Sequence, residues 1–281
     1  MGEARPCGLC GENDPAHFRI WFDDFVKLYK CQTCGFVEHH CGPGRPTVSY
    51  DYEHRDLLWF LERGQKFAHP EWRGLFEDTV ARIRREVPSG KLLDVGCGCG
   101  QFLSLCAEAG YEVYGVEDNA GRAEYSAEVS GAEVKRAQYS TDLYPENTFD
   151  VISFIQVLEH MLVPKETLEA ARYHLKPGGL LLVEVPSIRA PHFLAYQMTR
   201  MKRFVLTGSG VQQWHIGYYD HRTLQRMIEE SGFESGTIVT GRWGPKYDGA
   251  LGLIGRIFDP VFNAARIGGL MYMGRAKDAR S

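Results

Sequence analysis

Along most of the chain, short runs of apolar residues alternate with segments in which apolar residues recur every three or four positions. A short apolar run is typical of a buried strand, and the longer period is typical of a helix with one buried face. We therefore predict strands over residues 92–95, 112–116, 131–136, 149–155, 180–185, 237–240 and 271–275. The longer period predicts helices over residues 102–109, 120–130 and 164–175.

The order of these segments sets the expected fold class. Strands alternate with helices, which predicts a parallel sheet covered by helices on both faces. The expected fold is α/β: a seven-stranded, doubly wound, mostly parallel Rossmann-like sheet. In such sheets ligands bind beyond the carboxyl ends of the strands, so residues just after each strand are candidates for a site.

Composition shifts divide the chain into parts. A Gly/Pro-rich stretch at 41–46 marks a linker, and we expect an N-terminal module over 1–46, a helical connector over 47–88 and the α/β domain over 89–281. Residues 187–217, rich in aromatic side chains and methionine, are typical of a substrate lid; a pair of packing helices is the alternative. An apolar stripe over 251–265 fits core or a homodimer face, with membrane-surface binding as a lesser alternative.

Cysteine spacing predicts a metal site in the first part. Cys7 with Cys10, and Cys31 with Cys34, form two Cys-x-x-Cys-Gly pairs separated by twenty residues. This is the spacing of a four-thiolate zinc site. Short strands expected over 18–22 and 25–29 complete a zinc ribbon, a module with little core of its own without metal. A redox pair or free thiols are the alternatives.

Overall composition limits the class of protein and its expected compartment, but it does not indicate a function. The 281 residues carry a net charge of −4, with 44% hydrophobic and 24% charged residues, which is ordinary for a globular protein. This charge gives no general attraction to nucleic acid. No signal peptide and no run of 18 apolar residues are present. We therefore expect a cytoplasmic protein without a transmembrane segment.

The first strand of the α/β domain leads into three glycines at alternate positions, Gly96, Gly98 and Gly100. Residues without a Cβ let the backbone approach a ligand closely, and free N–H groups at a helix start favour a negative group. The spacing differs from the Gly-x-Gly-x-x-Gly that receives a pyrophosphate. After the second strand, Glu117 offers a paired acceptor for the two hydroxyls of a ribose.

Five segments, in order, resemble the motifs of class I S-adenosylmethionine-dependent methyltransferases, most closely the small-molecule enzymes of the ubiquinone-biosynthesis and related types. They read Leu-Asp-Val-Gly-Cys-Gly-Cys-Gly from residue 93, Val-Tyr-Gly-Val-Glu-Asp from 113, Phe-Asp-Val-Ile from 149, Val-Leu-Glu-His from 157 and Leu-Lys-Pro-Gly-Gly from 175. The resemblance implies an enzyme that uses S-adenosylmethionine as methyl donor, and it explains the glycine spacing, because this cofactor has no pyrophosphate.

The resemblance also implies which residues bind the cofactor. The three glycines approach its methionine and ribose, Asp94 lies near its amino group, and Glu117 holds the ribose hydroxyls. Most relatives have an aspartate facing the adenine where this chain has Gln138, whose amide oxygen can still accept. The full set of expected cofactor contacts is Asp94, Gly96, Gly98, Gly100, Gln101, Glu117, Asp118, Gln138, Tyr139 and Gln156.

Methyl transfer to a hydroxyl requires a group that removes the acceptor's proton, and histidine is suited to this near neutral pH. His160 ends the fourth-strand motif, and His215 begins the run after the expected lid. Either one is the expected general base. No sequence cluster of acidic residues and histidines indicates a catalytic metal, so we expect metal-independent transfer.

The leading functional hypothesis is methylation, preferably on oxygen, of a small hydroxylated or sugar-like metabolite in natural-product or cell-surface glycan synthesis. The four-cysteine module joined to this domain is similar to the arrangement in deoxysugar C-methyltransferases, although we expect no counterpart of their additional C-terminal domain. Two alternatives remain: an RNA methyltransferase whose ribbon reads RNA, and a non-catalytic scaffold whose ribbon binds a protein.

Overall fold

The computed structural model describes residues 6–23, 27–39, 70–189, 215–240 and 269–277. Part of the expected connector (47–69), most of the expected lid (190–214) and the apolar stripe at 251–265 lie outside these residues. Among the described residues, no helix is long and apolar enough to cross a membrane.

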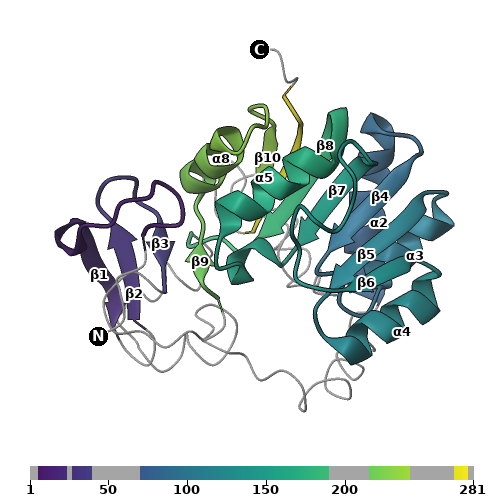
Figure 1. The fold of residues 1–281 in the computed structure, drawn as a ribbon, viewed down its shortest axis with the longest axis horizontal. Coiled ribbons are helices and arrows are strands. Elements are labelled where there is room, and N and C mark those ends of the chain that lie inside the picture. The colour runs from purple at the N-terminus through teal and green to yellow at the C-terminus, as the bar shows by residue number, and fades with distance from the viewer. Residues whose placement is uncertain (1–5, 24–26, 40–69, 190–214, 241–268, 278–281) are drawn as a thin grey trace, which may run out of the picture.

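The larger of two sheets has seven strands in the order β10-β11-β8-β7-β4-β5-β6. The five strands from β8 to β6 run parallel, and β11 and β10 add antiparallel strands at one edge (Figure 1). The bounds are β4 (Lys91–Val95), β5 (Glu112–Glu117), β6 (Glu133–Arg136), β7 (Phe149–Ile155), β8 (Leu175–Val185), β10 (Thr237–Thr240) and β11 (Leu270–Arg275).

Helices cover both faces of this sheet because the side chains of the central strands alternate between two cores. In β4, Leu93 and Val95 pack with α5 (Pro164–His174) and α8 (His221–Glu230). Leu92 points to the other core, beside α2 (Pro70–Glu86) and α3 (Gln101–Glu108). Helix α4 (Ala120–Ser130) contacts α3, β5 and β6. These two layers are the doubly wound arrangement predicted from the sequence.

The predicted seven strands are confirmed, and α4 and β10 have the predicted bounds. The largest difference is at β8, which begins at Leu175 rather than at residue 180. Leu175 is fully buried and is paired with Phe149 of β7, so the strand starts before the Pro-Gly-Gly turn and passes through it with a register irregularity.

The smaller sheet joins the N-terminal module to the rest of the chain. Its order is β1 (Phe18–Asp23), β2 (Lys27–Cys31), β3 (Val37–Glu38) and β9 (Gly217–Tyr218), all antiparallel. Figure 1 shows the module at the left of the view, beside β9. The first two strands were expected from the sequence, but the β3–β9 pair was not, because two-residue strands carry no periodic signal.

Helix α3 begins at a crowded glycine, which gives a test of the fold. We expect Gly100→Ala to destabilise the protein, because φ is +79° and a Cβ would lie 2.9 Å from the Ser126 Cα. The left-handed conformation costs about 1–2 kcal/mol and the overlap adds about 1–3 kcal/mol. The matched control is Gly110→Ala, where φ is +91° but no described atom lies within 4 Å. Urea unfolding should show the larger loss for Gly100→Ala; equal losses would contradict the packing described here.

Candidate active site and metal centre

The glycine turn joins β4 to α3 in a conformation that residues with a Cβ avoid. Gly96, Gly98 and Gly100 have φ of 68°, 57° and 79°. The Gly96 N–H donates to the Val116 carbonyl at 2.7 Å, which ties the turn to β5. A Cβ on Gly98 would meet no described atom within 4 Å, so this part of the backbone faces open space that a ligand can enter.

The carboxylate of Glu117 lies beside this turn, at the carboxyl end of β5, and is 5% exposed. One oxygen accepts the Gly98 N–H at 3.0 Å, and the other accepts the Asn119 N–H at 3.1 Å. The Arg122 guanidinium lies 2.7 Å away. Burial raises the pKa of Glu117, and the Arg122 charge opposes that rise. The carboxylate is therefore held at the turn by a guanidinium and two N–H donors, with lone pairs available to further donors.

A second buried acid, Asp94, lies at the end of β4. The Ser153 hydroxyl donates to its Oδ1 at 2.7 Å. Burial raises the pKa of Asp94 to about 7, and the Glu117 charge adds to the rise. A positive group bound nearby would favour the ionised form and lower this pKa. The pair of acids therefore favours a ligand that carries both hydroxyls and a cationic group.

Gln156 follows β7 in a strained backbone conformation, with φ of 59°. Its N–H donates to the Glu184 carbonyl at 2.8 Å, and its side-chain amide donates to the Glu184 carboxylate at 3.4 Å. A left-handed residue other than glycine costs about 1–3 kcal/mol, and such strain concentrates at functional sites. These contacts fix the chain where it leaves the sheet toward residues 157–160.

The remaining expected cofactor contacts lie around this edge of the sheet with different surroundings. Gln101 is the first residue of α3 and half-buried, and Asp118 is exposed, 3.5 Å from Arg122. Gln138 is exposed. The Tyr139 hydroxyl, in contrast, forms a hydrogen bond of 2.8 Å with His174 Nδ1, and the Tyr139 ring packs on Phe154. Its ring therefore belongs to the core behind the loop, and Gln138 has the side chain that faces outward there.

Three side chains converge next to the glycine turn and form what we name the Glu–His–His cluster: Glu159, His160 and His215. Glu159 and His160 lie on the short helix η2 (Leu158–His160), and His215 precedes β9. The two imidazole rings are 4.8 Å apart between centroids, and His160 Nε2 lies 3.9 Å from Glu159 Oε1. Val157 connects the cluster to the turn, because a Cβ added to Gly96 would lie only 2.6 Å from the Val157 Cγ2.

The cluster contains buried polar atoms that the described part of the chain does not satisfy. Both carboxylate oxygens of Glu159 and the Nδ1 of His215 have no hydrogen-bond partner among the described residues. Burial raises the pKa of Glu159 to about 8, and burial together with His160 lowers the pKa of His215 to about 3. Unpaired buried groups are costly, so the cluster is suited to receiving polar groups from a ligand.

Ligand atoms of all three residues lie within 4.8 Å of one another, a spacing that can also hold a metal ion. The expectation of metal-independent transfer rested on the apparent absence of such a set from the sequence. His215 is far from Glu159 in the sequence, so only the folded structure shows that the three residues lie together. The sequence therefore no longer supports the expectation of metal-independent transfer.

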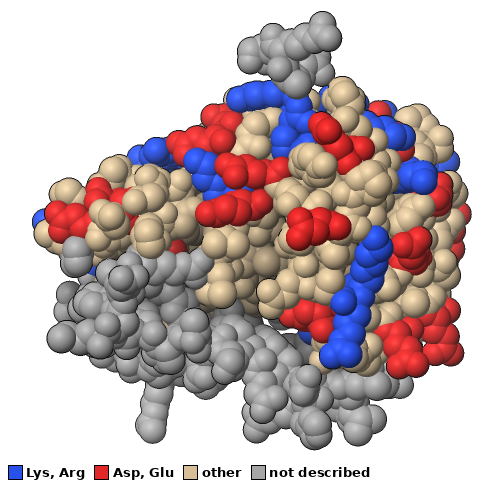
Figure 2. Space-filling model, in the orientation of Figure 1, with Lys and Arg blue, Asp and Glu red and all other residues tan. Residues whose placement is uncertain are grey.

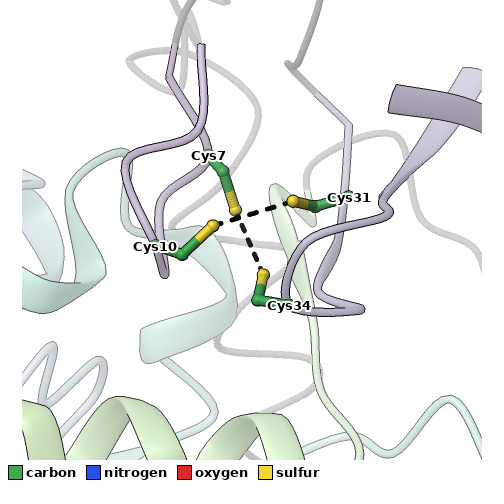
Figure 3. A group of neighbouring side chains, drawn as sticks. All are labelled: Cys7, Cys10, Cys31 and Cys34. Carbon is green, nitrogen blue, oxygen red and sulfur yellow. Dashed lines mark hydrogen bonds between the residues drawn. The ribbon is translucent and has the colours of Figure 1, made fainter. Parts of the chain in front are cut away.

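The four predicted zinc ligands converge in the N-terminal module, with their sulfur atoms facing one another (Figure 3). The Sγ atoms of Cys7 and Cys34 are 3.6 Å apart, and those of Cys10 and Cys31 are 3.7 Å apart. A tetrahedral zinc ion with bonds of about 2.3 Å places its sulfurs about 3.8 Å apart. Without a metal, burial raises the pKa of Cys10 to about 11, whereas a bound cation would favour the thiolates. The geometry therefore fits a zinc ion.

Sequence reasoning missed three residues that shape these sites. Arg122 pairs with Glu117, Ser153 holds Asp94, and Glu159 contributes the buried acid of the Glu–His–His cluster. Glu159 stands within the recognised Val-Leu-Glu-His motif, which was the available signal. The other two contacts depend on how neighbouring elements pack.

Comparison with known proteins agrees with this arrangement. Residues 65–236, more than half of the chain, match the family described as "Methyltransferase domain". The chain belongs to this family and has the fold of class I S-adenosylmethionine-dependent methyltransferases. This confirms the resemblance stated from the sequence motifs.

Among curated proteins, the chain is similar to a ubiquinone biosynthesis O-methyltransferase from Ruegeria pomeroyi, with 38% identity over 95 residues. A protein of the same name from Methylococcus capsulatus is 35% identical over 95 residues. Each match covers 32% of this chain and 38% or 40% of the relative, so the chain spans about two fifths of the length of these relatives.

Among solved structures, a Burkholderia thailandensis 1,6-didemethyltoxoflavin-N1-methyltransferase with bound S-adenosylhomocysteine has a TM-score of 0.53 and 15% identity, covering 93% of this chain and all of that one. A possible histamine N-methyltransferase from Thermotoga maritima has a TM-score of 0.54 and 16% identity, covering 78% and 97%. At these identities the similarity shows the fold alone.

Proposed function

We propose that this methyltransferase transfers the methyl group to a hydroxyl of a small molecule bound at the Glu–His–His cluster. The observation that carries the proposal is the position of the cluster, joined through Val157 to the glycine turn at the same edge of the sheet. Unsatisfied buried polar atoms of Glu159 and His215 supply the polar contacts that such an acceptor needs.

The cofactor side of the proposal assigns roles to residues at the strand ends. Glu117 holds the ribose hydroxyls, Asp94 lies toward the amino group, and Gly98 allows close approach of the backbone. S-adenosylmethionine supplies an electrophilic methyl group on sulfur when it is bound. The protein's task is then to align the acceptor oxygen with that methyl group and to take up its proton.

Within the cluster, His160 is the better candidate for the general base. Its side chain is 33% exposed, so an acceptor can reach it. His215 is 6% exposed, and the lowered pKa makes it a weak proton acceptor. We assign His215 to orienting the acceptor by a hydrogen bond.

The choice of acceptor is supported by the names of the relatives and by surface charge. Two relatives are named O-methyltransferases of ubiquinone biosynthesis, which favours a hydroxylated small molecule over the sugar-like alternative. Figure 2 shows acidic and basic side chains interspersed on the visible described face. On α2, the Arg82 guanidinium is paired with the Asp78 carboxylate. These features favour a small acceptor over RNA.

We further propose that the four-cysteine site holds structural zinc and that the division at 1–46, 47–88 and 89–281 describes the ribbon, the connector and the catalytic domain. The sulfur spacing supports the first part. The strand pairing of β3 with β9 means that the ribbon and the catalytic domain share a sheet.

Replacing the Glu117 carboxylate tests the cofactor assignment. We expect Glu117→Gln to weaken S-adenosylmethionine binding about tenfold or more, because charged hydrogen bonds contribute about 1.5–3 kcal/mol each. Isothermal titration calorimetry measures this directly. The control is Glu124→Gln on the exposed side of α4, which should bind normally. Equal affinities of both variants and the parent would refute the assignment.

Metal analysis tests the zinc proposal. The purified protein should contain about one zinc ion per chain, because four thiolates complete a tetrahedral site. Cys34→Ser should lower the zinc content severely, whereas Cys106→Ser, which removes a buried thiol of α3, should leave it unchanged. Zinc contents that respond alike in the two variants would show that the four-cysteine site is not the binding site.

Transfer of a labelled methyl group tests the reaction. Against a panel of phenols, catechols, nucleotide sugars and structured RNA, we expect a hydroxylated small molecule to be labelled. His160→Gln should lower kcat about 100-fold or more, as loss of a general base does, with unchanged cofactor affinity. His17→Gln, in the ribbon, is the control. Labelling of RNA alone, or full activity of His160→Gln, would contradict the proposal.

A further inference from the structure

A continuous path of backbone hydrogen bonds connects the four-cysteine module to the Glu–His–His cluster. The N–H of His39, just after β3, donates to the Ile216 carbonyl at 2.8 Å. The N–H of Ile216 in turn donates to the Glu159 carbonyl at 2.7 Å. Ile216 directly follows His215, and Glu159 is itself a member of the cluster. The path therefore leads from the module to both buried members of the cluster.

The elements that carry the cluster are too short to hold their own geometry. Strand β9 has two residues, and η2 is a single turn of three residues. Isolated strand pairs and short 3₁₀ turns are marginal in water without a packed neighbour. In the smaller sheet, β3 of the ribbon is the neighbour that pairs with β9. The position of His215 thus depends on an element of the ribbon.

A second set of contacts reaches the same place from the Cys31–Cys34 pair. The Arg222 guanidinium of α8 donates to the Cys34 carbonyl at 3.2 Å and fills the space over Gly35. Phe36 packs on Tyr219 with ring centroids 5.2 Å apart. The Tyr219 hydroxyl donates to the carbonyl of Leu158, the first residue of η2, at 3.3 Å. Both ends of the cluster are therefore connected to this cysteine pair.

Among the described residues, the backbone hydrogen bonds of the glycine turn lie within the α/β domain, although ribbon and domain share one hydrophobic core. The Gly96 N–H donates to the Val116 carbonyl, and the Gly98 N–H donates to the Glu117 carboxylate. Both hydrogen bonds lie within the larger sheet and its strand ends. A change in the ribbon should therefore reach the acceptor side and leave cofactor binding intact.

We propose that metal in the four-cysteine site positions the acceptor-side residues Glu159 and His215, so that metal loading sets the order of the acceptor site and not of the cofactor site. The assignment of the cluster to the acceptor rests on the proposed function; the structural coupling does not. A small ribbon folds when its cysteines bind the metal ion, and β3 is formed and paired with β9 in that folded state.

Hydrogen–deuterium exchange of the full chain, zinc-loaded and after chelation, tests the coupling without any acceptor. We expect residues 215–219 and 157–161 to exchange at least tenfold faster after metal removal. Residues 91–103 should change less than twofold, and S-adenosylmethionine affinity less than threefold. Persistent protection of 215–219 would overturn the proposal. Loss of protection everywhere, with loss of cofactor binding, would also overturn it, because the metal would then stabilise the whole fold without a specific connection.

A variant that keeps its metal separates coupling from ribbon unfolding. Arg222→Met removes the bond to the Cys34 carbonyl, and we expect exchange of 215–219 to rise about tenfold with zinc still bound. Arg226→Met, one turn further along α8, removes an exposed ion pair with Glu230 and is the matched control. Equal exchange in the two variants would refute the connection. Failure of methyl transfer to every acceptor would not alter these results, so the two proposals are tested separately.

Discussion

The buried carboxylate of Glu117 is the interaction on which the geometry of the glycine turn depends. It accepts the Gly98 N–H and lies against Arg122, so it fixes the glycine turn and keeps a negative charge at the end of β5. Burying that charge alone would be unfavourable, and the guanidinium and two backbone N–H groups offset the cost. The turn is thus preorganised, with open space over Gly98, before a ligand arrives.

The acceptor side is built on a different principle. Its polar atoms belong to a one-turn helix and to the residue before a two-residue strand, and these are held by contacts with elements distant in sequence. In the proposed function, the rigid sheet edge binds the donor and the supported, irregular segment binds the acceptor. The cysteine-rich module lies beside that segment because β3 pairs with β9 in the smaller sheet.

The sequence predicted the parts of this molecule that follow a regular period or a local motif. Seven strands, the glycine turn and the convergence of four cysteines were all foreseeable, because alternation, glycine spacing and Cys-x-x-Cys pairs are local signals. The β3–β9 pair and the Glu159–His215 proximity were not foreseeable, since they join segments more than fifty residues apart through elements too short to show a period. The packing of Tyr139 on Phe154 and His174 was also not foreseeable, because it joins a loop to β7 and α5.

We infer that donor and acceptor meet between the glycine turn and the Glu–His–His cluster. A crystal structure of the zinc-loaded protein with S-adenosylhomocysteine tests it most directly. The account predicts that the ribose hydroxyls contact the Glu117 carboxylate and that the sulfur faces His160 across an open, polar-lined space. A ribose held elsewhere, or a sulfur facing away from Glu159, His160 and His215, would contradict it.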